Sequence, residues 1–131
     1  MKAGLEPGKH AEIEITVTPA MCPHFDGELV HPLFSTWETV HYMEMAGRKV
    51  LAPHLDDDEE ALGAHITLDH KSPALIGARV VVRAEIESLH GQRLTCRVTA
   101  KSDGRLLATG RFVQIIMPKS RVAALLDRHA P

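Results

Sequence analysis

The sequence predicts an α+β fold in which one long helix packs on an antiparallel sheet of about five strands. Residues 34–50, FSTWETVHYMEMAGRKV, have the apolar spacing of an amphipathic helix. Several other segments alternate apolar and polar residues, which is the pattern of half-buried strands. A sheet must bury one face, and this helix is the only expected element large enough to cover it. A sheet wrapped around one central helix is therefore the economical arrangement.

Length and charge narrow the classes of protein to consider. The 131 residues are the size of one ordinary domain, so we expect a single domain over residues 1–131. The formal net charge is −2, and no run of Lys and Arg is longer than a pair, which argues against a nucleic-acid partner. No apolar run is long enough for a membrane span or a secretory signal, so we expect a cytoplasmic protein with no membrane partner.

The first half of the chain is expected to form a strand, a loop and the helix. In the strand at 11–17, AEIEITV, three apolar residues alternate with polar ones before Pro19 ends it. Residues 21–32 have no steady period and predict a loop that could lie over a site. Ser35 or Thr36 could cap the helix. The acidic run DDDEEA at 56–61 is interpreted as a solvated turn.

The second half is expected to contain four sequential antiparallel strands and a short C-terminal helix. Strands are predicted at 65–70, 78–88, 94–100 and 106–117, and Asp103-Gly104 marks a hairpin turn. Residues 119–129, after Pro118, have the pattern of a short amphipathic helix. The two cysteines, Cys22 and Cys96, lack metal-ligand spacing and are interpreted as reduced thiols, with Cys96 filling the core.

Three polar residues are candidates for a site. Glu44 falls inside the apolar stripe of the helix, His70 shares a strand face with Ile66 and Leu68, and Thr36 lies two helical turns before Glu44. A buried carboxylate must be paired, hydrogen-bonded or protonated, and a histidine partner meets that need. If the helix packs on the sheet, Glu44 and His70 are expected to meet in an apolar cleft. The pair could be structural, or it could form an active site with Thr36.

Other catalytic motifs are missing from the sequence. We find no H-E-x-x-H motif and no paired cysteines, so no metal site is expected. We also find no G-x-S-x-G nucleophile elbow and no glycine-rich phosphate loop. The candidate site is therefore a small group of polar side chains without a metal.

Two segments resemble a known family. VHPLFSTWETVHYMEMAGRKV at 30–50 and LGAHITLDHKSPALIG at 62–77 are similar to the fluoroacetyl-CoA thioesterase-like branch of the hot-dog-fold acyl-CoA thioesterases. The resemblance extends over essentially the whole chain, and its most specific parts are the Ser-Thr before the helix, the MEMA motif and the LG…H strand. The segment MCPHFDGELVHPLF at 21–34 departs from the family, because it is shorter than and unlike the aromatic lid associated with fluoroacetyl selection.

The resemblance implies a fold, a partner and a reaction. The fold would be a hot-dog fold, and the protein would be a homodimer with active sites at the subunit interface. The catalytic residues would be Thr36, Glu44 and His70, and Gly63 would bind the thioester carbonyl of the substrate. The reaction would be hydrolysis of a short-chain or otherwise undetermined acyl-CoA, and no cofactor is expected because CoA is part of the substrate.

The roles of some residues stay open at this level. Glu44 could attack the thioester carbon or orient a water, and His70 would move the proton. Lys71, Lys119 and Arg121 are the cations that could meet the CoA phosphates. An alternative function is a non-catalytic module that binds acyl-CoA or another small ligand. A hot-dog hydratase is a third hypothesis, although its D-x-N-P-x-H pattern is missing from the sequence.

Overall fold

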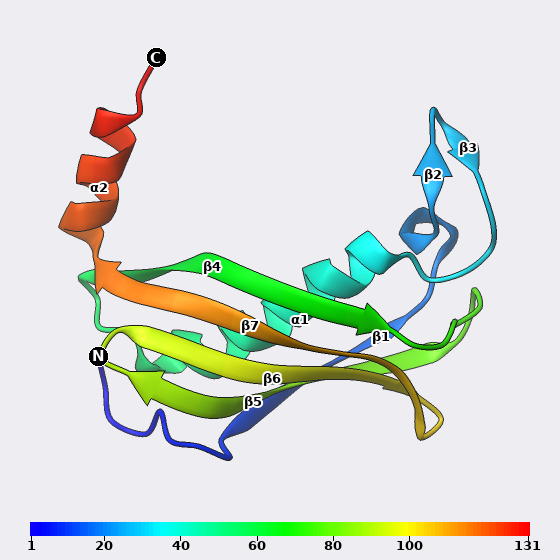
Figure 1. Cartoon of the computed structure of the whole chain (residues 1–131), viewed down its shortest axis with the longest axis horizontal. Helices are drawn as coiled ribbons and strands as arrows, with labels where there is room; N and C mark the ends of the chain where they lie inside the picture. The colour runs from blue at the N-terminus through cyan, green and yellow to red at the C-terminus, as the bar shows by residue number, and fades with distance from the viewer.

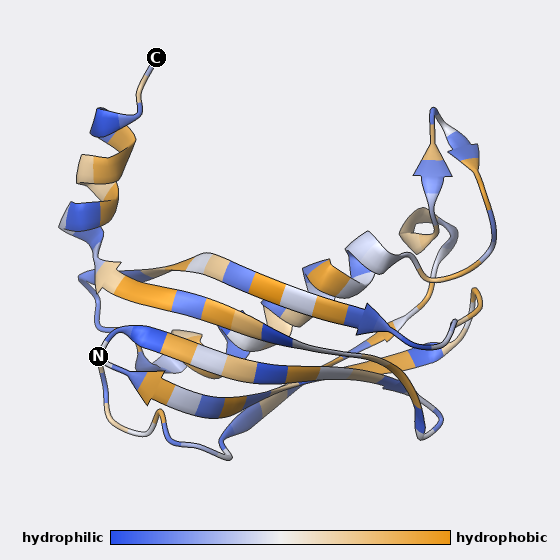
Figure 2. Cartoon of the chain, in the orientation of Figure 1, coloured by the Kyte–Doolittle hydropathy of each residue, from blue (hydrophilic) through white to orange (hydrophobic).

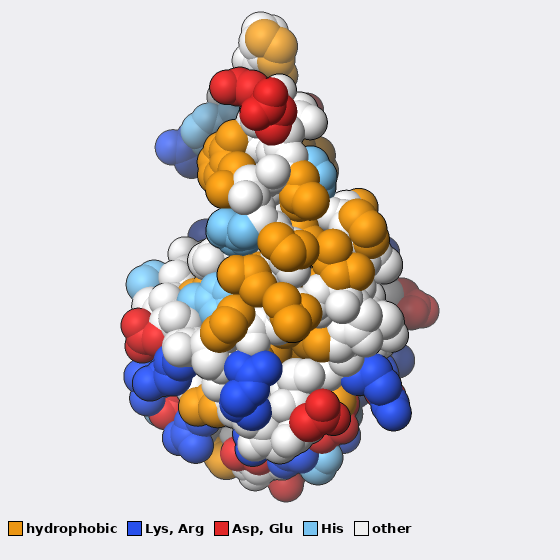
Figure 3. Space-filling view, turned by 90° about the vertical axis from the view of Figure 1, so that its right-hand side faces the viewer, with side chains coloured by type: hydrophobic (Ala, Val, Ile, Leu, Met, Phe, Trp, Pro, Cys, Tyr) orange, Lys and Arg blue, Asp and Glu red, His pale blue; other side chains and the backbone are white.

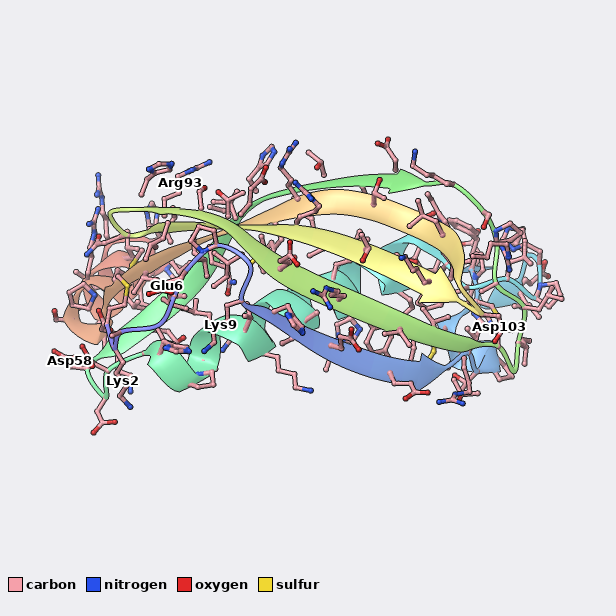
Figure 4. All side chains as sticks on the ribbon, turned by 90° about the horizontal axis from the view of Figure 1, so that it is seen from below. Lys2, Glu6, Lys9, Asp58, Arg93 and Asp103 are labelled. Atoms are coloured by element: carbon pink, nitrogen blue, oxygen red, sulfur yellow. The ribbon has the colours of Figure 1, made fainter.

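One antiparallel sheet curves over a long helix in the computed structural model, which describes all 131 residues (Figure 1; Figure 4). The strands lie in the order β1-β5-β6-β7-β4, and the helix is α1, Thr36–Leu51. The strand bounds are β1 His10–Thr16, β4 Glu59–His70, β5 Arg79–His90, β6 Arg93–Ser102 and β7 Arg105–Pro118. The predicted α+β fold with five strands around one helix is confirmed.

The core lies between α1 and the concave face of the sheet. Alternate residues of the central strands point into it, and Figure 2 shows the corresponding alternation of apolar and polar segments along the sheet. Cys96 is fully buried there, as predicted. Strands β5 and β6 contribute the inward-facing residues Val80, Val82, Ala84, Ile86, Leu94, Cys96, Val98 and Ala100.

Helix α1 begins at a polar cap. The Ser35 hydroxyl accepts a hydrogen bond from the backbone N–H of Glu38 at 3.2 Å, which satisfies one of the free donors of the first turn. Arg48 and Lys49 lie in the last turn, where their charge suits the helix dipole. A 3₁₀ turn at Ala52–His54 ends the helical path, and Pro53 lies within it. The sequence placed this helix correctly to within two residues.

Strand β4 begins earlier along the chain than the sequence indicated, and it has a different neighbour in the sheet. Glu59 and Glu60, expected in a solvated turn, pair with the end of β7, and β4 is the edge strand beside β7 rather than beside β5. At this end of the strand Arg48 forms an ion pair with Glu60, which lowers the pKa of that carboxyl. The N-terminal ammonium contacts Glu59 and Asp56 in the same way.

The segment at 21–32, predicted as a loop, contains a small hairpin. Strands β2, His24–Phe25, and β3, Glu28–Leu29, are joined by Asp26 and Gly27, both with positive φ. A 3₁₀ turn, η1, Pro19–Met21, precedes it. The hairpin stands beside the start of α1, and Phe25 meets Trp37 edge to face with ring centroids 5.5 Å apart. This end of the molecule exposes a cluster of hydrophobic side chains (Figure 3).

The C-terminal helix α2, Lys119–Arg128, stands away from the body of the molecule at the opposite end from the hairpin (Figure 1). It has no buried residue, although one side of it is apolar. Neither helix has the length and apolar character that crossing a bilayer requires.

Candidate active site

Thr36 and His70 lie side by side at one end of the molecule. Thr36 is the first residue of α1 and His70 is the last residue of β4, and Thr36 Oγ1 is 2.9 Å from His70 Nδ1. The chain beyond His70 is held by β7, because the N–H groups of Lys71 and Ser72 both donate to the carbonyl of Leu107. The hydrogen bond with Thr36 occupies Nδ1, so Nε2 is the ring nitrogen left to exchange a proton with a ligand.

An open cavity of about 610 Å³ adjoins this pair. Its walls are largely apolar and aromatic, and they include the hairpin residue Phe25 and the helix residue Trp37. A mostly apolar cavity with a few convergent polar groups is the usual form of a small-molecule site. The lining residues are Pro23, Phe25, His31, Leu33, Phe34, Ser35, Thr36, Trp37, His70, Lys71, Ser72 and Pro73.

Glu44 and Gly63 line a second cavity of about 520 Å³, farther along α1. The floor of this cavity is formed by Phe112 and Gln114 of β7. Arg48 also lines it but is paired with Glu60. The complete lining is Ile13, His41, Glu44, Met45, Arg48, Lys49, Ala61, Gly63, Phe112 and Gln114.

The expectation that Glu44 and His70 meet within one chain is wrong. Both residues are exposed, no hydrogen bond joins them, and they line different cavities. Thr36, the partner of His70, is eight residues from Glu44, which is about 12 Å along the helix axis. A single chain therefore brings Thr36 to His70 and Glu44 to Gly63, but it does not bring the two pairs together.

The reason lies in how α1 sits on the sheet. The helix packs chiefly on β1, β5 and β6, and its buried face is formed by Thr39, Met43, Ala46, Gly47, Val50 and Leu51. Glu44 points to the side of β4 and β7, which the helix covers less fully. The sequence pattern identified the apolar stripe but set its centre too close to Glu44.

Gly63 lies at an irregularity in β4. It is opposite Gln114 of β7, and the register shifts between Gly63 and His65. A β-bulge changes the direction of nearby backbone groups and is common beside active sites. A Cβ at residue 63 would be 3.3 Å from the ring of Phe112, so a glycine also suits the packing here.

Sequence reasoning missed Gln114, which is only 3% exposed and reaches α1. Its Nε2 donates a hydrogen bond to the carbonyl oxygen of Gly47 at 3.1 Å. The signal for it was present in the sequence, because Gln114 takes an inward position in the alternation of LLATGRFVQIIM. A polar residue at an inward position of a strand is a candidate for a site or a buried hydrogen bond.

The possible CoA-binding cations are at different ends of the molecule. Lys71 lines the first cavity beside His70. Lys119 and Arg121 lie on α2, which stands at the opposite end from the hairpin (Figure 1). Lys71 is therefore the only one of the three that adjoins the Thr36–His70 pair within the chain.

Comparison with known proteins connects this arrangement to thioesterases. The family model described as fluoroacetyl-CoA-specific thioesterase matches residues 17–120. The fluoroacetyl-CoA thioesterase of Streptantibioticus cattleyicolor is 29% identical over 99 residues, which are 76% of this chain and 71% of that protein.

Solved structures agree with the sequence comparison. A thioesterase superfamily member from Thermus thermophilus has a TM-score of 0.92 at 39% identity, over 96% of this chain and 93% of its own. The fluoroacetyl-CoA thioesterase FlK has a TM-score of 0.86 at 26% identity, over 98% and 99%. A hot-dog-like protein from Thermanaerovibrio acidaminovorans, with a TM-score of 0.87 at 15% identity over 95% and 93%, supports the fold alone. The predicted hot-dog fold is confirmed.

Proposed function

The chain belongs to the family of fluoroacetyl-CoA-specific thioesterases, which are hydrolases, and we propose that it hydrolyses short-chain acyl-CoA thioesters with Thr36, Glu44 and His70. The products are the carboxylic acid and free CoA. The observation that carries this proposal is the 2.9 Å contact between Thr36 and His70 at the wall of an apolar cavity. A histidine held by one ring nitrogen beside such a cavity is suited to general acid–base chemistry.

A complete site requires a second copy of the chain. Strand β4 is 12 residues long and pairs only with β7, so its other edge is free. A long free edge is a template for pairing with another strand, and a two-fold axis across β4 would join two copies in an antiparallel pair. Helix α1 also exposes two large apolar side chains, Trp37 (46%) and Met45 (43%), which favours burial against a partner.

Such a pairing would bring the two halves of the site closer. Within one chain Gly63 and His70 are seven positions apart on β4, which is roughly 23 Å at 3.3 Å per residue. In an antiparallel pair centred on the middle of β4, Gly63 of one copy lies opposite Ile66 of the other. His70 is then four positions, or roughly 13 Å, from the second copy's Gly63. Side chains and a thioester can span that interval, so each site uses Thr36 and His70 of one copy with Glu44 and Gly63 of the other.

The roles follow from the chemistry of each group. Glu44 activates a water or attacks the thioester carbon, and a backbone N–H at Gly63 stabilises the negative oxygen that develops. His70 gives a proton to the departing thiolate, and Thr36 orients the imidazole. Lys71 is placed to meet the CoA phosphates. The reaction as proposed requires no cofactor besides the CoA portion of the substrate.

The acyl group is proposed from the relatives. Solved structures of FlK include complexes with acetyl-CoA and with fluoroacetate and CoA. This chain has the short segment MCPHFDGELVHPLF with its β2–β3 hairpin in front of α1. Because this segment differs from the family's aromatic lid, we extend short-chain acyl-CoA to this protein but not selectivity for the fluorinated acyl group.

Thiol release tests the proposed activity. The purified protein should liberate free thiol from short-chain acyl-CoAs, and Glu44→Ala or His70→Ala should remove this activity while the protein stays folded. Glu38→Ala on the same helix and His90→Ala at the end of β5 are matched controls that should stay active. Saturable acyl-CoA binding without thiol release would instead indicate a non-catalytic binding module.

Mixing two inactive variants tests the shared site. If Glu44 and His70 act from different copies, a mixed dimer of Glu44→Ala and His70→Ala contains one intact site and one doubly altered site. Random exchange of subunits should then restore about one quarter of wild-type activity. If both residues act from the same chain, mixing restores nothing and the proposed interface site is wrong.

A further inference from the structure

A buried amide lies at the floor of the Glu44 cavity. Gln114 is 3% exposed, lines this cavity with Glu44 and Gly63, and is the register partner of Gly63 across the β4–β7 pair. A glutamine side chain has one acceptor oxygen and two donor hydrogens, and burying it is costly unless these groups find partners. The hydrogen-bond partners of the two ends of this amide therefore indicate its role.

One hydrogen bond fixes the orientation of this amide. Nε2 donates to the carbonyl oxygen of Gly47 at 3.1 Å, and a carbonyl can only accept, so the nitrogen must be the atom on that side. The approach is possible because residue 47 has no side chain: a Cβ there would be 2.5 Å from Phe112 Cδ2 and 3.4 Å from Gln114 Nε2. The hydrogen bond between β7 and α1 thus fixes which end of the amide faces the helix.

The carbonyl end of the amide is left open to the cavity. No hydrogen bond in the molecule involves Gln114 Oε1, and no buried side-chain oxygen or nitrogen lacks a partner. Oε1 must therefore keep some accessible surface, and we infer that this surface faces the cavity that Gln114 lines with Glu44. The cavity thus contains a neutral acceptor oxygen together with the carboxylate of Glu44.

We propose that Gln114 Oε1 and the Glu44 carboxylate together hold the water that attacks the thioester, which makes Gln114 a positioning residue for hydrolysis. A water that donates one hydrogen to each of two acceptors presents a lone pair in a fixed direction. This inference rests on the proposed function, and it selects the water route over direct attack by Glu44.

The reaction is balanced along this route. The water oxygen forms a bond to the thioester carbon while one of its protons passes to Glu44, and the carbonyl oxygen becomes an oxyanion. The oxyanion then collapses, the carbon–sulfur bond breaks, and the CoA thiolate takes a proton from His70. One water is consumed, one carboxylic acid and one thiol are released, and the proton on Glu44 returns through solvent to the imidazole. The Gln114 amide stays neutral throughout.

Substituting Gln114 tests its role. Gln114→Leu keeps a similar volume but removes the acceptor, so kcat should fall about ten-fold to a hundred-fold while KM stays within about two-fold. Gln92→Leu, at an exposed turn, is the matched control and should leave kcat and KM unchanged. Gln114→Asn shortens the side chain and should not restore kcat, because its oxygen would be about 1.5 Å from the required position.

A purely structural role would give a different result. If Gln114 only clamps β7 to α1, Gln114→Leu would lower the melting temperature and leave kcat of the folded enzyme within two-fold of wild type, which would overturn the inference. The pH profile supplies a second measurement: Gln114→Glu puts another carboxylate beside Glu44, so the pH at which kcat reaches half its maximum should rise. An unchanged pH profile of folded Gln114→Glu would also contradict the inference.

Isotope labelling detects direct attack in which water opens the anhydride intermediate at the Glu44 carbonyl. After a single turnover in ¹⁸O-water, the label should be in the released acid and not in the peptide that contains Glu44; a labelled Glu44 would overturn the inference.

Failure of the proposed function and failure of the inference about Gln114 give different results. If the wild-type protein releases no thiol, the proposed function is wrong. If the wild-type protein releases thiol, and Glu44→Ala abolishes this activity while Gln114→Leu leaves it unchanged, only the inference about Gln114 is wrong.

Discussion

Gly47 shows how one residue lets β7 approach α1. A Cβ at this position would be 2.5 Å from the ring of Phe112, closer than side chains can pack. Alanine is a better helix former than glycine by about 1 kcal/mol, but overpacking a core costs about 1–3 kcal/mol. The clash is therefore expected to exceed the gain in helix propensity.

We predict that Gly47→Ala lowers the free energy of unfolding by about 1 kcal/mol, measured by urea denaturation. Gly63→Ala is a graded comparison, because its Cβ would be 3.3 Å from Phe112 and a small shift of the ring accommodates it. It should lose less stability than Gly47→Ala. A Gly47→Ala protein more stable than wild type would contradict this prediction, because it would show that the Phe112 ring can move away from a side chain at residue 47.

The two thiols provide a second prediction at the level of single residues. Cys22 and Cys96 are both buried and unpaired, and burial raises the pKa of Cys96 to about 11. Burial disfavours the charged thiolate, which is the reactive form, so neither thiol should react with a disulfide reagent at pH 8 in the native protein. Both should react after unfolding in guanidinium. A thiol that titrates in the native state would contradict the placement of these side chains and would add a background to the thiol-release assay.

At the scale of an element, the cap of α1 connects stability with the site. Ser35 Oγ accepts from the N–H of Glu38, and the next residue, Thr36, contacts His70. Losing a serine cap typically costs about 1 kcal/mol. Because the first turn carries Thr36, fraying of that turn would also disturb the His70 contact.

We therefore expect Ser35→Ala to lower the melting temperature by about 3–5 °C and to reduce kcat. Calorimetry and the thiol-release assay measure the two effects. Ser120→Ala, in the exposed first turn of α2, is the matched control and should change neither quantity, because no side chain caps that helix. Loss of stability without loss of activity in Ser35→Ala would show that Thr36 is held by other contacts.

At the scale of the whole molecule, the two edges of the sheet differ. The free edge of β4 lies beside the exposed face of α1 that carries Glu44, whereas β1 forms the other edge and its backbone is contacted by Lys49, which donates to the carbonyl of Glu12 at 2.7 Å. The proposed dimer pairs β4 with its own copy and leaves β1 free.

Hydrogen exchange should detect that difference. Dilution below the dimer dissociation constant should accelerate amide exchange in β4, because amides on its outer edge lose their partners, while β1 should exchange at the same rate at all concentrations. Sedimentation over the same range should show a species of twice 14.4 kDa giving way to the monomer. Exchange in β4 that does not depend on concentration would contradict pairing through this edge.

The sequence by itself determined the position of α1 along the chain and the inward faces of the central strands. Alternation with a period of two identified the residues of β5 and β6 that fill the core, and the helical period placed α1 within two residues. These patterns can be interpreted locally because a strand or a helix repeats within a few residues. The Thr36–His70 contact was also within reach, since the resemblance to the thioesterase family named both residues.

Only the tertiary structure decided how the helix is turned on the sheet and which strands are neighbours. The stripe of α1 is broad, so its centre depends on which strands lie beneath it, and packing on β1, β5 and β6 left Glu44 outside the buried face. Pairing of β4 with β7 likewise depends on contacts between residues 38 to 59 positions apart, from His70 with Ala108 to Glu59 with Pro118, which no local period encodes. Those long-range contacts separate Glu44 from His70 within one chain, and they place Gln114 in the cavity that Glu44 lines.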